Sequence, residues 1–168
     1  MRYCLDTNAL IEICKTDENL IRFFQKVIPS SDEFYIPSYV VDEFEIGLDA
    51  NPDQACRVNL LSLLDCVNVA EEHFFTLDQS LLSGIDVLAS GNSGFSKLKY
   101  SMDDYKKSGS TKSYDVWRRR VLNDHLIAEM SDGQNCDGII TANKTDFKKI
   151  DDSLNLKIVS IEEFFRKS

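Results

Sequence analysis

Short apolar runs and longer stretches with helical spacing alternate along the chain. The apolar runs predict buried strands at residues 3–5, 34–36, 66–69, 138–141 and 156–159. The stretches between them predict helices from residue 8, over 17–27, from 38 through 48, from 52 to about 64, from 71 to about 88, from 114 to about 130 and from 160. Short apolar strands separated by helices predict an α/β fold whose parallel sheet is covered on both faces.

One stretch departs from this pattern. Residues 89–113 are rich in Gly, Ser and Lys, and their composition predicts a mobile excursion from an otherwise regular domain. The whole chain of 168 residues has the length of one domain, which we expect to span residues 1–168.

Composition indicates a protein without a membrane segment. The chain is 43% apolar and 28% charged, and its apolar runs are far shorter than the roughly 20 residues that a spanning helix needs. No charged leader precedes the first predicted strand, and the five cysteines are odd in number and form no C-x-x-C pair. We therefore expect a soluble, cytoplasmic protein with reduced cysteines.

Charge is distributed unevenly. The net charge of −9 argues against an indiscriminate nucleic-acid binder, yet residues 97–120 hold eight basic residues against three acidic ones. This basic segment is either a solvated surface or a nucleic-acid contact, and charge alone does not decide between them.

The first candidate for chemistry follows the first predicted strand. Asp6 comes directly after Cys4 and Leu5, so its side chain should emerge at the carboxyl edge of the sheet, where ligands gather in parallel sheets. Asp6 can equally be a helix cap, and capping is the better interpretation of Asn8.

Two further acids interrupt apolar helix faces. Glu43 lies on the same helical side as Val40 and Gly47, where it either has a functional role or merely reaches from an apolar stripe to water. Asp124 interrupts the stripe that contains Trp117, and a carboxylate there needs a positive partner. That partner is either an arginine or lysine in a structural salt bridge or a metal ion.

The last candidates follow the strand predicted at 138–141. Thr141 ends this strand, Asn143 has the position of a helix cap, and Asp146 falls in the first helical turn. An acid at that position also simply favours the helix dipole.

Convergence of these acids would demand a cation. At ~4 Å and an effective dielectric of ~20, each carboxylate pair repels by about 4 kcal/mol. Oxygen ligands favour Mg²⁺ or Mn²⁺, which activate water and neutralise charge on a phosphodiester. The chain contains no nucleotide-binding glycine motif and no G-x-S-x-G, and its histidines, His73 and His125, are expected to be structural. Metal-dependent phosphodiester cleavage is the chemistry that these residue types favour.

Four segments together resemble the PIN domain, and most closely the VapC-like toxins of toxin–antitoxin pairs. The segments are LDTNAL, VVDEFEIGL, NDHLIAEM and IITANKTDF, and they occur in the order that the family has. The resemblance covers residues 1–50 and 121–166, whereas residues 71–120 are longer than the middle of a typical small PIN toxin and match none of its motifs.

The resemblance implies a three-layer α/β/α sandwich and endonucleolytic cleavage of RNA. It implies that the four acids carry Mg²⁺ or Mn²⁺, with neighbouring polar side chains positioning water or substrate. The implied catalytic and metal-binding residues are Asp6, Glu43, Asp124 and Asp146, and the implied positioning residues are Asn8, Thr141 and Asn143. It also implies a homodimer and an antitoxin whose tail lies across the acidic groove.

The basic segment is the expected RNA contact. We expect its lysines, Lys97, Lys99, Lys106 and Lys107, to hold RNA against an otherwise repulsive acidic body. Two other interpretations remain at this point: a phosphotransfer enzyme with Asp6 as nucleophile, and a catalytically silent RNA-binding or scaffold module.

Overall fold

The protein folds around a parallel β-sheet. A computed structural model describes residues 1–70, 101–147 and 156–166, with the side chains of Ala70 and Asp146 excepted. Within these residues the sheet has five strands in the order β3-β2-β1-β4-β5, all paired in parallel. The strands are β1 Arg2–Leu5, β2 Glu33–Pro37, β3 Asn68–Ala70, β4 Gly138–Thr141 and β5 Lys157–Ser160.

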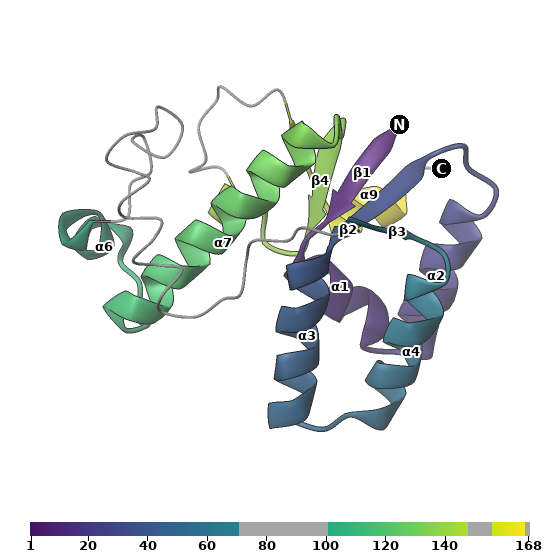
Figure 1. Ribbon diagram of the computed structural model, residues 1–168, viewed down its shortest axis with the longest axis horizontal. Coiled ribbons are helices and arrows are strands. Elements are labelled where there is room, and N and C mark those ends of the chain that lie inside the picture. The colour runs from purple at the N-terminus through teal and green to yellow at the C-terminus, as the bar shows by residue number, and fades with distance from the viewer. Residues whose placement is uncertain (71–100, 148–155, 167–168) are drawn as a thin grey trace.

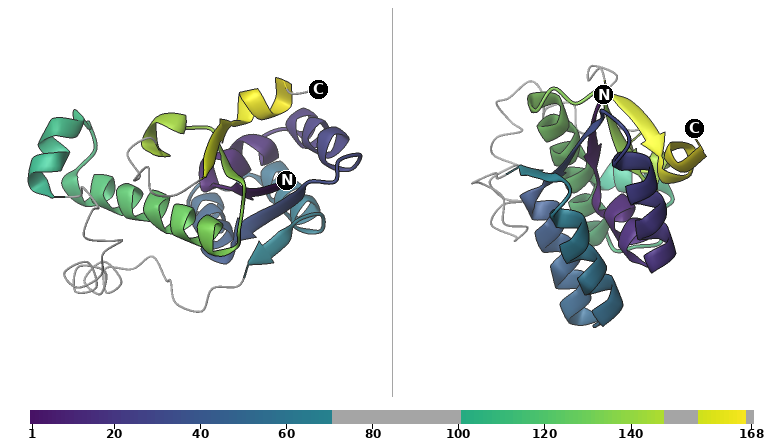
Figure 2. Two further views of the ribbon diagram at one scale, coloured as in Figure 1. Left: turned by 90° about the horizontal axis from the view of Figure 1, so that it is seen from above. Right: turned by 90° about the vertical axis from the view of Figure 1, so that its right-hand side faces the viewer.

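Helices cover both faces of this sheet, as the alternating pattern predicts. The described helices are α1 Thr7–Cys14, α2 Asp17–Val27, α3 Ser38–Ala50, α4 Gln54–Leu64, α6 Met102–Ser108, α7 Tyr114–Gly133, α8 Lys144–Phe147 and α9 Ile161–Arg166. Helix α7 packs on one face against β1 and β4, whereas α1, α2 and α9 lie on the other face, and α3 and α4 pack against α1 (Figures 1 and 2). The result is a three-layer α/β/α sandwich.

Alternation along β1 shows why both faces are apolar. The Tyr3 ring stacks on Phe34 and meets Phe164 edge-on, beneath α2 and α9. Cys4, the next residue, lies on the opposite face near Ser131 of α7. Because successive strand residues point to opposite faces, a strand covered on both sides must be apolar throughout.

Strand register sets the place of the candidate site. Leu5 pairs with Ile140, and the Asp6 N–H donates to the Ile140 carbonyl oxygen at 3.1 Å. Asp6 and Thr141 therefore leave neighbouring strands side by side at the carboxyl edge of the sheet.

Several predicted elements match closely, because their sequence signals are local. Helix α2 and strand β4 have the predicted bounds. Helix α9 begins where predicted, with Ser160 and Glu163 forming a capping box: Ser160 N donates to Glu163 Oε2 at 3.0 Å, and Glu163 N donates to Ser160 Oγ at 3.1 Å.

The structure differs from prediction in residues 101–113. Their Gly, Ser and Lys content predicts an irregular excursion, but they contain α6, which a capping box between Ser101 and Asp104 starts and left-handed Gly109 ends. The rest of the predicted excursion, 89–100, and the helix predicted over 71–88 lie outside the described residues.

Helix α6 and the first turns of α7 form an arm, residues 101–120, that extends away from the sheet (Figure 2). Tyr105, Tyr114 and Trp117 hold the arm together through ring contacts with centroids 5.6 to 6.2 Å apart.

Among the described residues, no helix combines the length and apolar character needed to cross a bilayer.

Candidate active site

Asp6 is buried at the carboxyl edge of the sheet, with 1% of its surface exposed. Its Oδ1 accepts from the Ala9 N–H at 2.7 Å, which makes it the N-cap of α1, and its Oδ2 accepts from Thr141 Oγ1 at 2.7 Å. Burial raises the pKa of Asp6 from 3.8 to about 6, against the lowering effect of its hydrogen bonds, and the nearby charge of Glu43 raises it further. Asp6 thus lies at the predicted edge of the sheet and is also the cap of α1.

Asn8 does not cap the helix, contrary to prediction. It lies inside the first turn of α1 and is exposed, because the helix begins one residue earlier with Asp6 as its cap. Its side chain instead hydrogen-bonds Asp6 and lowers the pKa of that carboxyl. Asn8 is therefore a neighbour of the acid.

Glu43 is half-buried on α3, and two neutral donors hold its carboxylate. Thr7 Oγ1 donates to Oε2 at 2.5 Å, and Asn123 Nδ2 donates to Oε1 at 3.3 Å. A Cβ at Gly47, one turn away, would contact nothing within 4 Å. The donors come from α1 and α7, so three helices meet at this carboxylate.

Tyr39 of α3 is a buried tyrosine that lies near Asp6, Glu43 and Asp124. Its ring is 2% exposed, and its hydroxyl donates to the Asn123 carbonyl oxygen at 3.4 Å. Burial raises the pKa of Tyr39 well above 10, and the charges of Glu43, Asp124 and Asp6 act in the same direction. Asp6, Glu43 and Asp124 thus all lie within electrostatic reach of one buried phenol.

The end of β4 completes the described part of the site. Thr141 is fully buried, and its Oγ1 accepts from the Asn143 N–H at 2.9 Å while donating to Asp6. Asn143 directly precedes α8, as expected for a cap, and Asp146 belongs to α8. The Asp146 side chain lies outside the described part of the structure, so its predicted role stays a prediction.

The donor set fits a hard dication in its chemistry. It consists of oxygens only, and the Asp6 and Glu43 charges disfavour each other, a conflict that a cation relieves. Among the described side chains, however, no group of three or more His, Cys, Asp or Glu residues is arranged to hold a metal ion. The described residues thus show two neighbouring carboxylates, Asp6 and Glu43, but no complete metal site.

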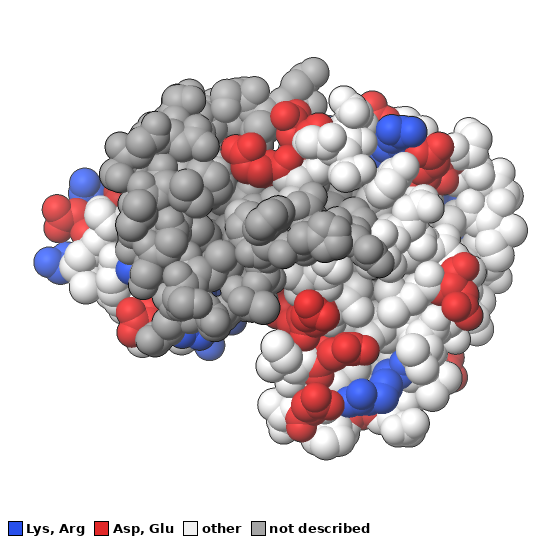
Figure 3. Space-filling view, viewed as in Figure 1, with Lys and Arg blue, Asp and Glu red and all other residues white. Residues whose placement is uncertain are grey.

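Two of the four lysines predicted to contact RNA lie outside the residues that the structure describes. Lys106 and Lys107 are exposed in the last turn of α6, whereas Lys97 and Lys99 fall among the residues that the structure does not describe. Acidic side chains gather instead along α3 (Figure 3), and one of them, Asp49, pairs with Arg57 of α4 at 2.7 Å.

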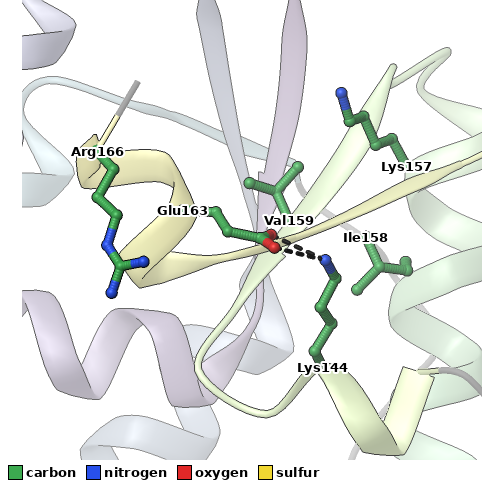
Figure 4. Close-up of a pocket in the computed structure, with 6 residues that line it drawn as sticks. All are labelled: Lys144, Lys157, Ile158, Val159, Glu163 and Arg166. Atoms are coloured by element: carbon green, nitrogen blue, oxygen red, sulfur yellow. Dashed lines mark hydrogen bonds and ion pairs between the residues drawn. The ribbon is translucent and has the colours of Figure 1, made fainter. Parts of the chain in front are cut away.

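A groove of about 370 Å³ lies along β5 between α8 and α9 (Figure 4). Lys144 and Glu163 meet across it at 2.8 Å, and this ion pair ties α8 to α9. Contact with Lys144, together with hydrogen bonds from Ser160, lowers the pKa of Glu163 to about 2. The pair holds the segment that carries Asn143 and Asp146 close to the end of β4.

Sequence reasoning missed Thr7, Tyr39 and Asn123. Thr7 and Asn123 are each adjacent in sequence to a predicted acid, and this adjacency is the signal that could have identified them. His125 is buried on α7, 3.3 Å from Glu129, which agrees with the structural role expected of it, whereas His73 lies outside the description.

The parallel sheet, its helical layers and the polar edge define a PIN-like α/β/α fold. The chain matches no protein-family model and no curated protein sequence. It resembles a chain in the crystal structure of VapBC2 from Rickettsia felis bound to a DNA fragment from their promoter, with a TM-score of 0.54 and 17% identity over 95% of this chain and 98% of that chain. A likeness at this identity is one of fold.

Proposed function

We propose that the protein is a Mg²⁺- or Mn²⁺-dependent endoribonuclease and acts as the toxin of a toxin–antitoxin pair. The observation that supports this most is the buried Asp6, hydrogen-bonded to Thr141 and within the field of Glu43, at the carboxyl edge of a PIN-like sheet. Burying charges of the same sign next to each other is costly, and functional sites are where folds retain such an arrangement.

The proposal gives each residue of the candidate site a task. Asp6 and Glu43 would hold the ion, with Asp124 and Asp146 as further acids; a bound dication lowers the pKa of water and neutralises charge on a phosphodiester. Thr141 fixes Asp6 through a 2.7 Å hydrogen bond, and the Asn143 N–H fixes the Thr141 hydroxyl in turn. Asn8 and Asn143 are exposed next to these groups, where they can orient substrate or water.

The test is cleavage of RNA with Mg²⁺ or Mn²⁺ present. We expect activity that EDTA abolishes and that Asp6→Asn and Asp124→Asn each reduce by at least about a hundredfold, the scale on which loss of one charge-stabilising group acts. Asp42→Asn is the matched control, since Asp42 is an exposed acid on α3. Cleavage without metal, or cleavage that survives both substitutions, would reject the proposal.

Partners follow from the same proposal. The Rickettsia felis structure holds VapBC2 on promoter DNA, and we infer an antitoxin partner for this chain whose tail lies across the acidic groove, together with a homodimer. Co-expression with a small adjoining reading frame should yield a complex without ribonuclease activity. A complex that cleaves RNA as fast as the free chain would contradict this inference.

The phosphotransfer alternative is less well supported. Phosphotransfer sites with a nucleophilic aspartate, such as those of haloacid dehalogenases, have a second Asp at the position where this chain has Asn8. Detection of a covalent phosphoaspartate on the wild-type chain separates the two enzymatic functions, because only phosphotransfer through Asp6 forms one. A silent RNA-binding module would bind RNA without metal-dependent cleavage.

A further inference from the structure

Asn123 connects α7 to the candidate site. Its side-chain Nδ2 donates to Glu43 Oε1 at 3.3 Å, while its main-chain carbonyl oxygen accepts from the Tyr39 hydroxyl at 3.4 Å. Tyr39 and Glu43 are one helical turn apart on α3, so Asn123 contacts two successive turns of that helix. Asn123 thereby fixes α3 and α7 relative to each other where both carry a candidate acid.

The two oxygens of Glu43 have different donors. The Thr7 hydroxyl occupies Oε2 from α1, and the Asn123 amide occupies Oε1 from α7. A glutamate has three side-chain torsions, and restricting them before a ligand arrives saves the ordering cost at binding. A pair of donors on opposite oxygens fixes both the position and the plane of the carboxylate.

We propose that Asn123 is a positioning residue that acts through Glu43: with Thr7 it orients this carboxylate toward Asp6 and thereby sets the affinity of the site for a divalent cation. The proposal rests on the metal-dependent function proposed above. A neutral amide suits this role, because it donates a hydrogen bond without a positive charge that would compete with the ion.

The experiment measures Mn²⁺ binding by isothermal titration calorimetry on the full chain, with no RNA present. We expect Asn123→Ala to weaken Mn²⁺ binding by about tenfold to a hundredfold, the range for loss of a partner that orients a metal ligand. Asn123→Leu, of similar size and good helix propensity, should give the same loss if the alanine variant folds poorly. Far-ultraviolet circular dichroism verifies that each variant is folded.

A double-mutant cycle with Glu43→Gln distinguishes positioning from a general effect on structure. If Asn123 acts through Glu43, adding Asn123→Ala to Glu43→Gln changes Mn²⁺ affinity little further. The matched control is Asn19→Ala, which removes an amide that contacts Glu12 at 2.8 Å and 3.5 Å on α1, outside the candidate site. This control should bind Mn²⁺ as the wild type does.

The outcomes separate the two levels of the proposal. Wild-type binding that Asn123→Ala and Asn123→Leu leave unchanged, or effects of Asn123→Ala and Glu43→Gln that simply add, would overturn the role of Asn123 alone. Failure of the wild-type chain to bind Mn²⁺ would overturn the metal-dependent function and, with it, this role.

Discussion

At the scale of single residues, Asp6 combines the capping of α1 with the chemical role that we propose for it, at a cost in stability. A buried carboxylate is disfavoured in its charged form, and burial accordingly raises the pKa of Asp6 to about 6, although the carboxylate accepts from Ala9 and Thr141. Asparagine retains an oxygen that can cap α1 but carries no charge. Asp6→Asn therefore separates the two tasks.

We predict that Asp6→Asn stabilises the metal-free protein at neutral pH. Between pH 3.8 and about 6 the folded chain binds more protons at Asp6 than the unfolded chain, so wild-type stability falls as pH rises through this window. A shift of this size corresponds to at most about 3 kcal/mol. In urea unfolding with EDTA, the free energy of unfolding of the variant should exceed that of the wild type by an amount that grows from about pH 4 to about pH 6 and stays constant above that. A variant less stable than the wild type at neutral pH would contradict the prediction.

The hydroxyl of Thr141 makes a second prediction. Its hydrogen bond lowers the pKa of Asp6, so Thr141→Val should raise that pKa above about 6 and leave less of the carboxyl ionised near neutrality. In the pH profile of RNA cleavage, the rise in rate on the acid side should therefore move to higher pH in Thr141→Val. Thr141→Ser should keep the wild-type profile. Identical profiles for the valine variant and the wild type would show that the hydroxyl does not tune Asp6.

At the scale of elements, the cap of α9 also ties α8 in place. Lys144 and Ser160 lower the pKa of Glu163 to about 2, so this carboxylate contributes stability that is present above its unfolded value of 4.5 and is lost as pH falls to about 2. Glu163→Gln keeps the hydrogen bonds of a capping box and removes only the charge.

We predict that Glu163→Gln lowers stability at neutral pH and that the difference from the wild type closes between pH 4.5 and about 2. Glu162→Gln is the control, because the neighbouring Glu162 has only a loose contact of 3.8 Å with Arg166. Thermal unfolding of the three proteins at several pH values measures this. A pH-independent difference would assign the effect to packing.

Most strands and helices, though not all, could be predicted from local sequence patterns. Strand β4 and helix α2 could be placed from local patterns, because a buried strand is a short apolar run and α2 has one apolar side. Helix α6 was missed because Gly, Ser and Lys dominate its surroundings, although the capping pair Ser101 and Asp104 is visible in the sequence. Local patterns thus predict most of the sheet.

The candidate site is only partly predictable for a related reason. That Asp6 and Thr141 lie at the same edge follows from a parallel sheet, which the alternation of strands and helices predicts, whereas the pairing of β1 with β4 is known only from the structure. The donors to Glu43 do not, because Thr7 and Asn123 lie 36 and 80 residues from it in sequence. Which face of α3 meets α1 and α7 is decided by packing between helices, and no periodicity within one helix encodes it.

At the scale of the whole molecule, the distribution of charge opposes the proposed substrate. A net charge of −9 repels RNA, and the surface of α3 is acidic (Figure 3). The arm presents Lys106 and Lys107 beside aromatic residues, and α7 leads from the arm directly to Asn123 and Asp124. RNA held on the arm would therefore lie in line with the candidate site.

We predict that reversing Lys97, Lys99, Lys106 and Lys107 to glutamate weakens RNA binding and leaves Mn²⁺ affinity unchanged. The slope of log affinity against log salt should fall by about 0.7 for each lost phosphate contact on single-stranded RNA. Lys106→Glu with Lys107→Glu tests the described part of the arm, and the matched control reverses the exposed Lys15 and Lys157, which changes the net charge equally. Filter binding at several salt concentrations measures both pairs. If the two pairs weaken binding equally, repulsion by total charge explains the effect and the arm has no specific role.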